Sequence, residues 1–249
     1  MQRGTRPMLC HTHRFDILEP GPILLNYAPE FETLGPDVYH PAEKGGRSRR
    51  LAQHYATFDP KTGEVKVIRL MTQPFLQGET NKLTGHIERP IEPTLPTTDM
   101  TKYIEYGFKS IEERWPLDGL ENEWLVNCHL IRTHARGPQQ GVPVPEGIHR
   151  DGVDFLIMGA VSRNGISGGV SHIYESPDQK PIFETTLMPG QAILVDDQKL
   201  YHMASSIVAT DGEGHRDMIL MGFHFWSRNH YRFDWRDHVY DPNVHKKPK

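Results

Sequence analysis

The sequence predicts a mainly β domain, a barrel or sandwich, with N-terminal strands and one supporting helix. Three observations predict it. From residue 123 onward, short β-prone segments recur about every 8–12 residues, separated by Gly, Pro and Asp. One segment near residue 100 has the apolar spacing of an amphipathic helix. Hydrophobic residues make up 37% of the 249 residues, which is enough for one sizeable core and too much for a disordered chain.

The N-terminal part is predicted to hold two strands and an extended connector. Residues 1 to about 50 are rich in Pro and Gly and follow no regular pattern. Residues 51–58 and 64–71 are β-prone, and between them lies a run with the chemistry of a turn, Asp59-Pro60-Lys61-Thr62-Gly63. The segment 89–97 contains Pro90, Pro93 and Pro96, which exclude a helix and favour an extended chain.

The supporting helix is predicted to begin at Asp99 and to end before Pro116. Apolar residues recur at spacings of three and four, which places them on one face: Met100, Tyr103, Ile104, Phe108, Ile111 and Trp115. Thr98 or Asp99 can cap the first turn. A helix with one such face must pack on another layer, and we expect this layer to be the outside of a sheet.

The remaining elements are predicted strands of the β core: 123–134, 153–161, 170–176, 182–187, 191–196, 200–207 and 216–226. We expect one domain over residues 1–249. In it, residues 1–120 hold the N-terminal strands, the loops and the supporting helix, residues 121–230 hold the β core, and residues 231–249 form a C-terminal tail.

Composition argues against several classes of protein. The net charge is −4 and no long basic run occurs, so no nucleic-acid partner is expected. We interpret the short cluster Arg47-Ser48-Arg49-Arg50 as a solvated loop. Cys10 and Cys128 form no disulfide or zinc motif. Neither an apolar signal core nor a run of about 20 apolar residues is found, so we expect a soluble cytoplasmic protein without a membrane span.

Fifteen histidines direct attention to metal binding, and the strongest candidate is His149 with Asp151. Residues i and i+2 of an extended chain point to the same side, so this imidazole and this carboxylate can reach one point. His202 follows at a distance that leaves room for roughly four strands, which in a barrel returns the chain to the first two ligands. Two His and one carboxylate with open positions suit Fe(II). By contrast, we interpret His11 and His13 as part of a flexible tail.

Arg216 opens a strongly apolar strand, so we expect its guanidinium to have an anionic partner. A carboxylate that accepts two parallel hydrogen bonds fits this role, and the dicarboxylate 2-oxoglutarate would supply one. A structural ion pair with Asp217 or Asp211 is the alternative.

The sequence resembles a family at this point, the bacterial 2-oxoglutarate/Fe(II) dioxygenases typified by L-isoleucine hydroxylase. The resemblance covers about residues 120–228, and four elements carry it: Pro145-Glu146-Gly147-Ile148-His149-Arg150-Asp151-Gly152-Val153-Asp154, Gly168-Gly169, Asp196-Asp197 before His202, and His215-Arg216-Asp217. It implies a double-stranded β-helix (a cupin-like jelly roll), with Fe(II) on His149, Asp151 and His202, and Arg216 on the distal carboxylate of 2-oxoglutarate. Many 2-oxoglutarate enzymes have a Ser or Tyr two residues after this Arg, whereas this chain has Met218.

By the same resemblance, the expected activity uses O2 and 2-oxoglutarate to hydroxylate a C–H bond of a free L-amino acid, mostly an aliphatic one, with release of succinate and CO2. The carboxylate of Asp151 favours hydroxylation over halogenation. Three alternatives stay open: a cupin-like metalloenzyme without 2-oxoglutarate, a cyclised or desaturated product, and a β-barrel that only binds a ligand. A protein-modifying hydroxylase is a fourth, although the chain has no obvious peptide-docking module.

Further residues are weaker candidates. Asn127 and His129 share one face of the strand 123–134 and are possible substrate contacts, because polar side chains that point into a barrel need a reason. Arg132 is on the other phase of that strand, where it could pair with a substrate carboxylate or lie on the surface. His224 shares the face of Arg216, and we favour a packed histidine there. Gly168-Gly169 is interpreted as a tight turn rather than a phosphate loop.

Overall fold

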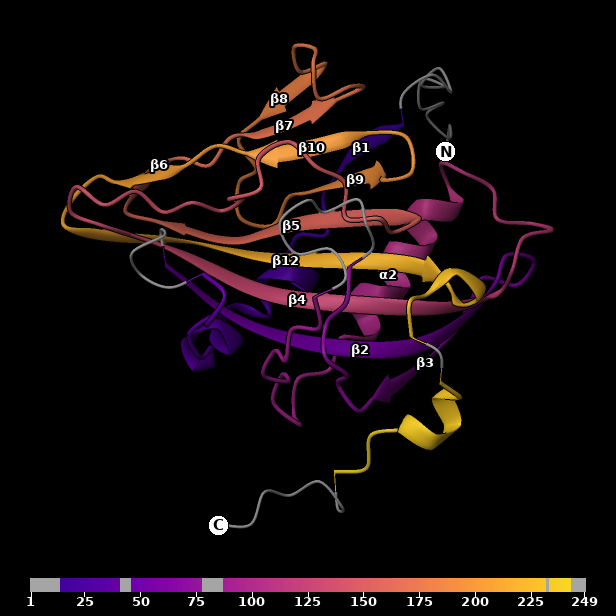
Figure 1. Cartoon of the computed structure of the whole chain (residues 1–249). Coiled ribbons are helices and arrows are strands. Elements are labelled where there is room, and N and C mark those ends of the chain that lie inside the picture. The colour runs from indigo at the N-terminus through magenta and orange to yellow at the C-terminus, as the bar shows by residue number, and fades with distance from the viewer. Residues whose placement is uncertain (1–13, 41–45, 78–86, 232, 243–249) are drawn as a thin grey trace, which may run out of the picture.

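The computed structural model describes residues 14–40, 46–77, 87–231 and 233–242, and His11 and His13 lie outside them. One seven-stranded antiparallel sheet dominates it, in the order β1-β9-β5-β12-β4-β2-β3. Its strands, in sheet order, are Phe15–Leu18, Ala192–Asp196, Phe155–Asn164, Glu213–Phe225, Glu123–Arg136, Arg47–Asp59 and Glu64–Leu70. Figure 1 shows the long strands β2, β4, β12 and β5 side by side.

The second layer is built from short strands. It consists of the sheet β10-β7-β8 and the pair β11-β6, with bounds Tyr201–Ala204, Ser171–Tyr174, Phe183–Thr185, Ile207–Ala209 and Ile166–Gly168. The chain between β4 and β5 extends this layer through two antiparallel bridges, Gly141 with Ile207 and His149 with His202. The two layers form the double-stranded β-helix that the resemblance implied.

The predicted helix is confirmed as α2 (Thr101–Glu112), which begins two residues later than expected. Asp99 accepts a hydrogen bond from the Thr101 amide at 2.9 Å, as a residue that precedes a helix does. The apolar face of α2 is fully buried against alternate residues of the long strands, among them Trp124, Ile157 and Phe223. In Figure 1, α2 lies behind the large sheet, so the opposite face of that sheet is left to face the second layer.

The other helical segments are short: α1 (Pro22–Leu25), η1 (Ala28–Thr33), η3 (Trp226–Arg228) and η4 (Trp235–His238). From the predicted tail, Tyr231, Phe233 and Trp235 pack against the small cluster of Tyr55, Leu70 and Leu125. The ring of Trp235 stacks on that of Tyr55 at 4.1 Å between centroids. None of the helices in the described parts of the chain is long and apolar enough to cross a membrane.

The predicted strands are confirmed, with three differences. The segment 200–207 divides into β10 and β11, because the chain changes partner from β7 to β6. Strands β1 (Phe15–Leu18) and β6 (Ile166–Gly168) were not expected, since four and three residues are too few to show a period. The third difference concerns the start of β2. The cluster Arg47-Ser48-Arg49-Arg50 is not a solvated loop but opens β2, with Arg47 and Arg49 each 8% exposed.

Candidate metal centre

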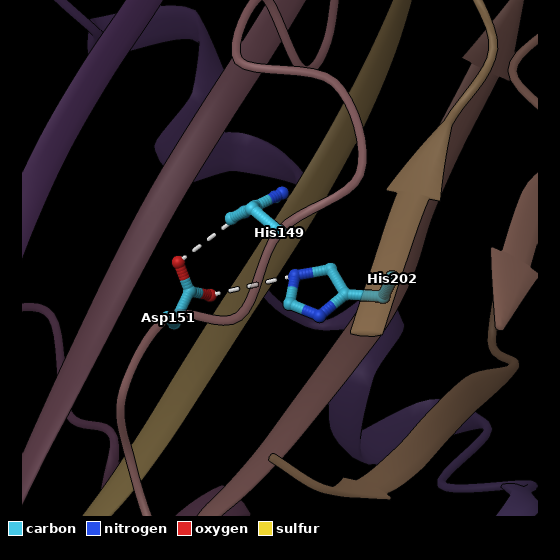
Figure 2. A group of neighbouring side chains, drawn as sticks. All are labelled: His149, Asp151 and His202. Atoms are coloured by element: carbon cyan, nitrogen blue, oxygen red, sulfur yellow. Dashed lines mark ion pairs between the residues drawn. The ribbon is translucent and has the colours of Figure 1, made fainter. Parts of the chain in front are cut away.

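Two of the three predicted metal ligands lie on adjacent extended segments. His149 and His202 exchange both backbone hydrogen bonds, at 3.1 and 2.9 Å, so their side chains start from paired positions. Their rings are 4.4 Å apart between centroids. Asp151 follows two residues after His149 and turns back toward both rings, as Figure 2 shows.

The geometry of the three side chains fits one metal ion. His149 Nε2 lies 3.5 Å from Asp151 Oδ1, and His202 Nε2 lies 3.7 Å from Asp151 Oδ2. One ligand atom from each residue falls within 4.8 Å of the others. Two imidazoles and one carboxylate that converge from one side form a facial triad, a set of donors that suits Fe(II) and leaves coordination positions open.

Neighbouring groups fix the orientation of each ligand. His149 Nδ1 lies 3.0 Å from the Gly147 carbonyl, which turns Nε2 toward Asp151. Asp197 is completely buried and accepts hydrogen bonds from the backbone amides of Asp151, Gly152 and Val153 at 3.2, 2.7 and 3.1 Å. One of its oxygens is also 3.5 Å from His202 Nδ1, so this carboxylate holds the segment of Asp151 and the ring of His202 in place. In the sequence, Asp197 was noted only as part of the motif before His202. Its hydrogen bonds to the ligand segment were not predicted.

The protonation states of the triad suit metal binding. Burial opposes ionisation of Asp151, but the hydrogen bond and charge of His149 outweigh it and lower the pKa of this carboxyl. Burial and the nearby charge of His149 lower the pKa of His202 to about 3, so this ring is neutral. Burial also opposes the charged form of His149, yet Asp151 raises its pKa to about 9, so a metal has one proton to displace there.

The triad opens into a cavity between the two layers. Alternate residues of β12 line it, as period-2 counting predicts: Arg216, Met218, Leu220, Gly222 and His224. His224 is therefore a cavity residue, and it is also buried, as the predicted packed histidine would be. Strand β4 contributes Asn127 and His129, which lie on the cavity side where the sequence placed them.

Arg132 is a correction to the predicted set of substrate contacts. Its side chain is on the other face of the large sheet, where its guanidinium donates two hydrogen bonds to Asp217, at 2.7 and 2.9 Å, and a third to Glu32. It is not among the residues that line the cavity. The same contact removes Asp217 as a partner of Arg216, because adjacent residues of a strand point to opposite faces.

Arg216 is buried in the cavity wall without an acidic partner. In the parts of the chain that the structure describes, no carboxylate lies within ion-pair distance of its guanidinium, and its buried Nε has no hydrogen-bond partner. Its Nη2 donates to Ser171 Oγ on β7 at 3.4 Å. In this chain the hydroxyl next to the arginine is therefore that of Ser171. The sequence did not identify it, because it comes from the other layer rather than from position 218. Burial and the charge of Arg163 lower the pKa of Arg216 to about 10.

Gly168 and Gly169 form the expected tight turn. Both have positive φ, +78° and +67°, and a Cβ on Gly168 would lie 2.3 Å from the Ser206 carbonyl oxygen. The turn lets the chain pass from β6 to β7, the strand that carries Ser171.

A second group of cationic residues lines the same cavity: Arg47, Arg49 and Arg89. Arg47 is 3.0 Å from Asp37, and Arg49 Nη2 is 2.9 Å from His129 Nδ1. This group was not predicted from the sequence. A signal was present, because Arg47 and Arg49 alternate at the start of a strand and therefore point to the same side.

Comparisons with known proteins add the family. The family model described as "2OG-Fe dioxygenase" matches residues 28–222. No curated protein matches the sequence. In fold, the chain is similar to a bsmA homologue from Methylobium petroleophilum PM1, with 23% identity, a TM-score of 0.71, and coverage of 86% of this chain and 90% of the other.

Two further solved structures share the fold. One is IDO from Bacillus thuringiensis, with 16% identity, a TM-score of 0.64, and coverage of 82% and 83%. The other is TqaL, an Fe(II)/α-ketoglutarate-dependent dioxygenase, with 16% identity, a TM-score of 0.55, and coverage of 86% and 83%.

The matched range holds all three side chains of the triad and Arg216. Enzymes of the matched family use Fe(II), 2-oxoglutarate and O2, and the donor set of the triad suits Fe(II). The family match covers most of the chain, and the fold agrees with it. The chain therefore belongs to the 2OG-Fe dioxygenase family.

Proposed function

We propose that this protein hydroxylates a C–H bond of a free L-amino acid, with aliphatic amino acids as the first candidates. In this proposal His149, Asp151 and His202 hold Fe(II), and Arg216 binds the distal carboxylate of 2-oxoglutarate. The family match supports the use of 2-oxoglutarate over the cupin-like alternative without it. The amino-acid substrate is supported by the sequence resemblance of residues 120–228. A soluble, cytoplasmic enzyme is part of the same proposal.

One observation carries the co-substrate part of the proposal: the buried guanidinium of Arg216 lines the same cavity as the triad and has no carboxylate partner among the described residues. A buried cation without a partner costs several kcal/mol, so such an arrangement implies a ligand with a negative charge. A dicarboxylate that reaches from the metal to Arg216 satisfies this requirement, and its far end gains two charge-assisted hydrogen bonds.

The residues of the chain then have separate tasks. When bound, Fe(II) with 2-oxoglutarate and O2 supplies the oxidising chemistry, and 2-oxoglutarate leaves as succinate and CO2. Asp151 contributes the negative charge of the triad, and Asp197 keeps the ligands in position. Leu156, Met158 and Leu220 line the wall with apolar surface that excludes water from the reacting centre.

The test is a succinate-release assay across the twenty L-amino acids with Fe(II), 2-oxoglutarate and ascorbate, followed by mass analysis of the product. We expect succinate with at least one amino acid and a product that has gained one oxygen atom. His149→Ala should abolish succinate release, which would exclude a barrel that only binds a ligand. A product that has lost two hydrogens instead would assign desaturation or cyclisation.

Arg216→Ala tests the co-substrate site. We expect the KM for 2-oxoglutarate to rise at least tenfold, because the distal carboxylate of 2-oxoglutarate would then be buried without the guanidinium that pairs with it. Arg136→Ala is the matched control, since this arginine has an exposed side chain at the end of β4. An Arg216→Ala enzyme with an unchanged KM for 2-oxoglutarate would overturn the assignment.

A further inference from the structure

Two buried arginines on the far side of β4 from Arg216 share one aromatic ring. The guanidinium of Arg49 lies 5.3 Å from the ring centroid of Phe75, and that of Arg89 lies 5.0 Å from it. Arg49 is 8% exposed and Arg89 is 3% exposed, and both line the cavity that holds the triad. Like charges this close repel one another, so the pair needs a compensating anion.

The acids of the described residues compensate this pair only weakly. Asp37 forms its shorter ion pair with Arg47, at 3.0 Å, and only a long one with Arg49, at 4.0 Å. No described carboxylate lies within ion-pair distance of Arg89. The hydrogen-bond partners of Arg49 and Arg89 are neutral groups, His129 and the side-chain oxygen of Gln77. The Nε atoms of both arginines are buried and have no hydrogen-bond partner among the described residues.

The neutral state of His129 follows from the same charges. Burial and the charge of Arg49 lower the pKa of this ring well below its ordinary value. Burial, followed by the charge of Arg47, lowers the pKa of Arg49 to about 9. The guanidinium groups of Arg49 and Arg89 thus line the cavity with a positive charge that is only partly compensated and with Nε–H donors that have no partner among the described residues.

This pair is separate from Arg216 but coupled to the metal centre. The sheet order β12-β4-β2 places two strand spacings, about 10 Å, between the strands of Arg216 and Arg49. Gln77 bridges the pair to the triad, because its amide nitrogen donates to Asp151 Oδ1 at 2.9 Å while its oxygen accepts from Arg89. An anion on the pair would therefore lie in the metal cavity, on a different wall from the anion on Arg216.

We propose that Arg49 and Arg89 form a second anion site, which binds the carboxylate of the substrate and orients it over the metal. This inference rests on the proposed function, since it names the residues that recognise the substrate of that same centre. It limits the substrate to molecules with a free carboxylate and makes the N-terminal half of the chain, through β2 and the segment around Arg89, the part that recognises it.

The experiment compares Arg49→Gln and Arg89→Gln with the wild-type enzyme, using the best amino acid of the twenty-member panel and its C-terminal amide. We expect each variant to raise the KM for the amino acid at least tenfold, with a much smaller change in the KM for 2-oxoglutarate. The wild type should prefer the acid over the amide by at least tenfold, and both variants should lose most of this preference. Arg89→Lys, which keeps the charge, should recover part of it.

Arg50→Gln is the matched control, because Arg50 is on the same strand, points away from the cavity and pairs with Glu92. An unchanged KM for the amino acid in both variants would overturn the proposal. A rise in the KM for 2-oxoglutarate instead would also overturn it, since the pair would then serve the co-substrate. Circular dichroism confirms that each variant is folded.

A second arm does not depend on turnover. Sodium acetate, compared with sodium chloride at matched ionic strength, should raise the Tm of the wild type and of Arg216→Ala more than that of an Arg49→Gln/Arg89→Gln double variant. If no amino acid supports succinate release, the proposed substrate class is wrong. The Tm comparison still shows whether Arg49 and Arg89 bind a carboxylate. An equal rise in Tm with acetate in all three proteins would overturn the proposed anion site.

Discussion

At the scale of single residues, Ser171 illustrates how the second layer completes a group on the first. Its hydroxyl accepts a hydrogen bond from Arg216 and is buried, with 4% of its surface exposed. It thereby holds the guanidinium in the position where it would meet a carboxylate. No spacing along the chain relates residue 171 to residue 216, so only the fold brings the two together.

Ser171→Ala should therefore weaken 2-oxoglutarate binding. Loss of one hydrogen bond to a charged group is worth roughly 1 kcal/mol, which is about a fivefold rise in the KM for 2-oxoglutarate. Steady-state kinetics with varied 2-oxoglutarate would measure it. Ser167→Ala on the exposed strand β6 is the control. Equal KM values in Ser171→Ala and Ser167→Ala would mean that the hydroxyl has no part in the site.

His54 is a buried histidine outside the cavity, and it makes stability depend on pH. Burial, followed by the charge of Arg69, lowers its pKa to about 3, whereas in the unfolded chain it titrates near 6.5. Between these values the unfolded chain binds a proton that the folded chain refuses. Stability therefore falls as pH falls from about 6.5 toward 3, by roughly 1.4 kcal/mol per pH unit for this one group.

We expect His54→Gln to flatten this dependence. Urea unfolding of both proteins at pH 7, 6, 5 and 4.5 gives the two slopes, and the contributions of all other acidic groups cancel in the difference between them. The variant should lose less stability than the wild type over this range. Parallel curves would show that the pKa of His54 is the same in the folded and the unfolded chain.

Residue-level prediction was most successful where chemistry demanded particular side chains at particular spacings. The triad and the cavity position of Arg216 followed from a His-x-Asp pair, a later His and a charged residue in an apolar strand. Prediction failed for Arg47 and Arg49, because nearby glycines suggested a loop while the neighbours that bury these arginines come from other segments. Arg132 was ambiguous for a related reason, since the sequence does not say which face of a strand is the cavity face.

At the scale of elements, the turn after β9 supports the segment that carries two metal ligands. Asp197 accepts three backbone hydrogen bonds from residues 151–153 and contacts His202 on β10. The segment has no regular secondary structure of its own around Asp151, so this one carboxylate replaces the strand partners that it lacks.

Asp197→Ala should lower metal affinity by roughly 10–100-fold, the usual effect of removing a group that orients metal ligands. Titration with Mn(II), followed by the change in intrinsic fluorescence or by calorimetry, would measure it. Asp197→Asn keeps one acceptor oxygen and should lie between Asp197→Ala and the wild type. Asp196→Asn is the control, since the Asp196 side chain pairs with Arg14 instead. Wild-type affinity in Asp197→Ala would remove Asp197 from the site.

Elements with a strong period were predicted within a few residues, among them α2, β2, β3 and β4. Short elements were harder. Strands β1 and β6 have four and three residues, and they are strands because β9 and β11 offer them backbone partners. The pairing of His149 with His202 has the same origin, and no local pattern announces it.

At the scale of the whole molecule, the site joins parts of the chain that fold from distant segments. Ligands from the 149–151 segment and from β10 meet only in the folded protein, so a bound metal stabilises the folded state alone. At a free metal concentration about a hundred times Kd, this linkage is worth roughly 2.7 kcal/mol.

Mn(II) should therefore raise the Tm of the wild type by several degrees, and 2-oxoglutarate should raise it further only when Mn(II) is present. Differential scanning fluorimetry would detect both shifts, and a chelator should reverse them. His149→Ala should lose both shifts, whereas Arg216→Ala should lose only the second. A metal shift of full size in His149→Ala would place the metal elsewhere.

The walls of the cavity have different origins along the chain. The metal ligands and Arg216 come from the second half of the sequence, whereas Arg49, Phe75 and Arg89 come from the first. Evolutionary substitutions in the first hundred residues can therefore change the substrate preference and leave the metal ligands and Arg216 unchanged. Gln77 is the exception, because its side chain hydrogen-bonds both Arg89 and Asp151. A substitution at Gln77 would affect both halves of the site.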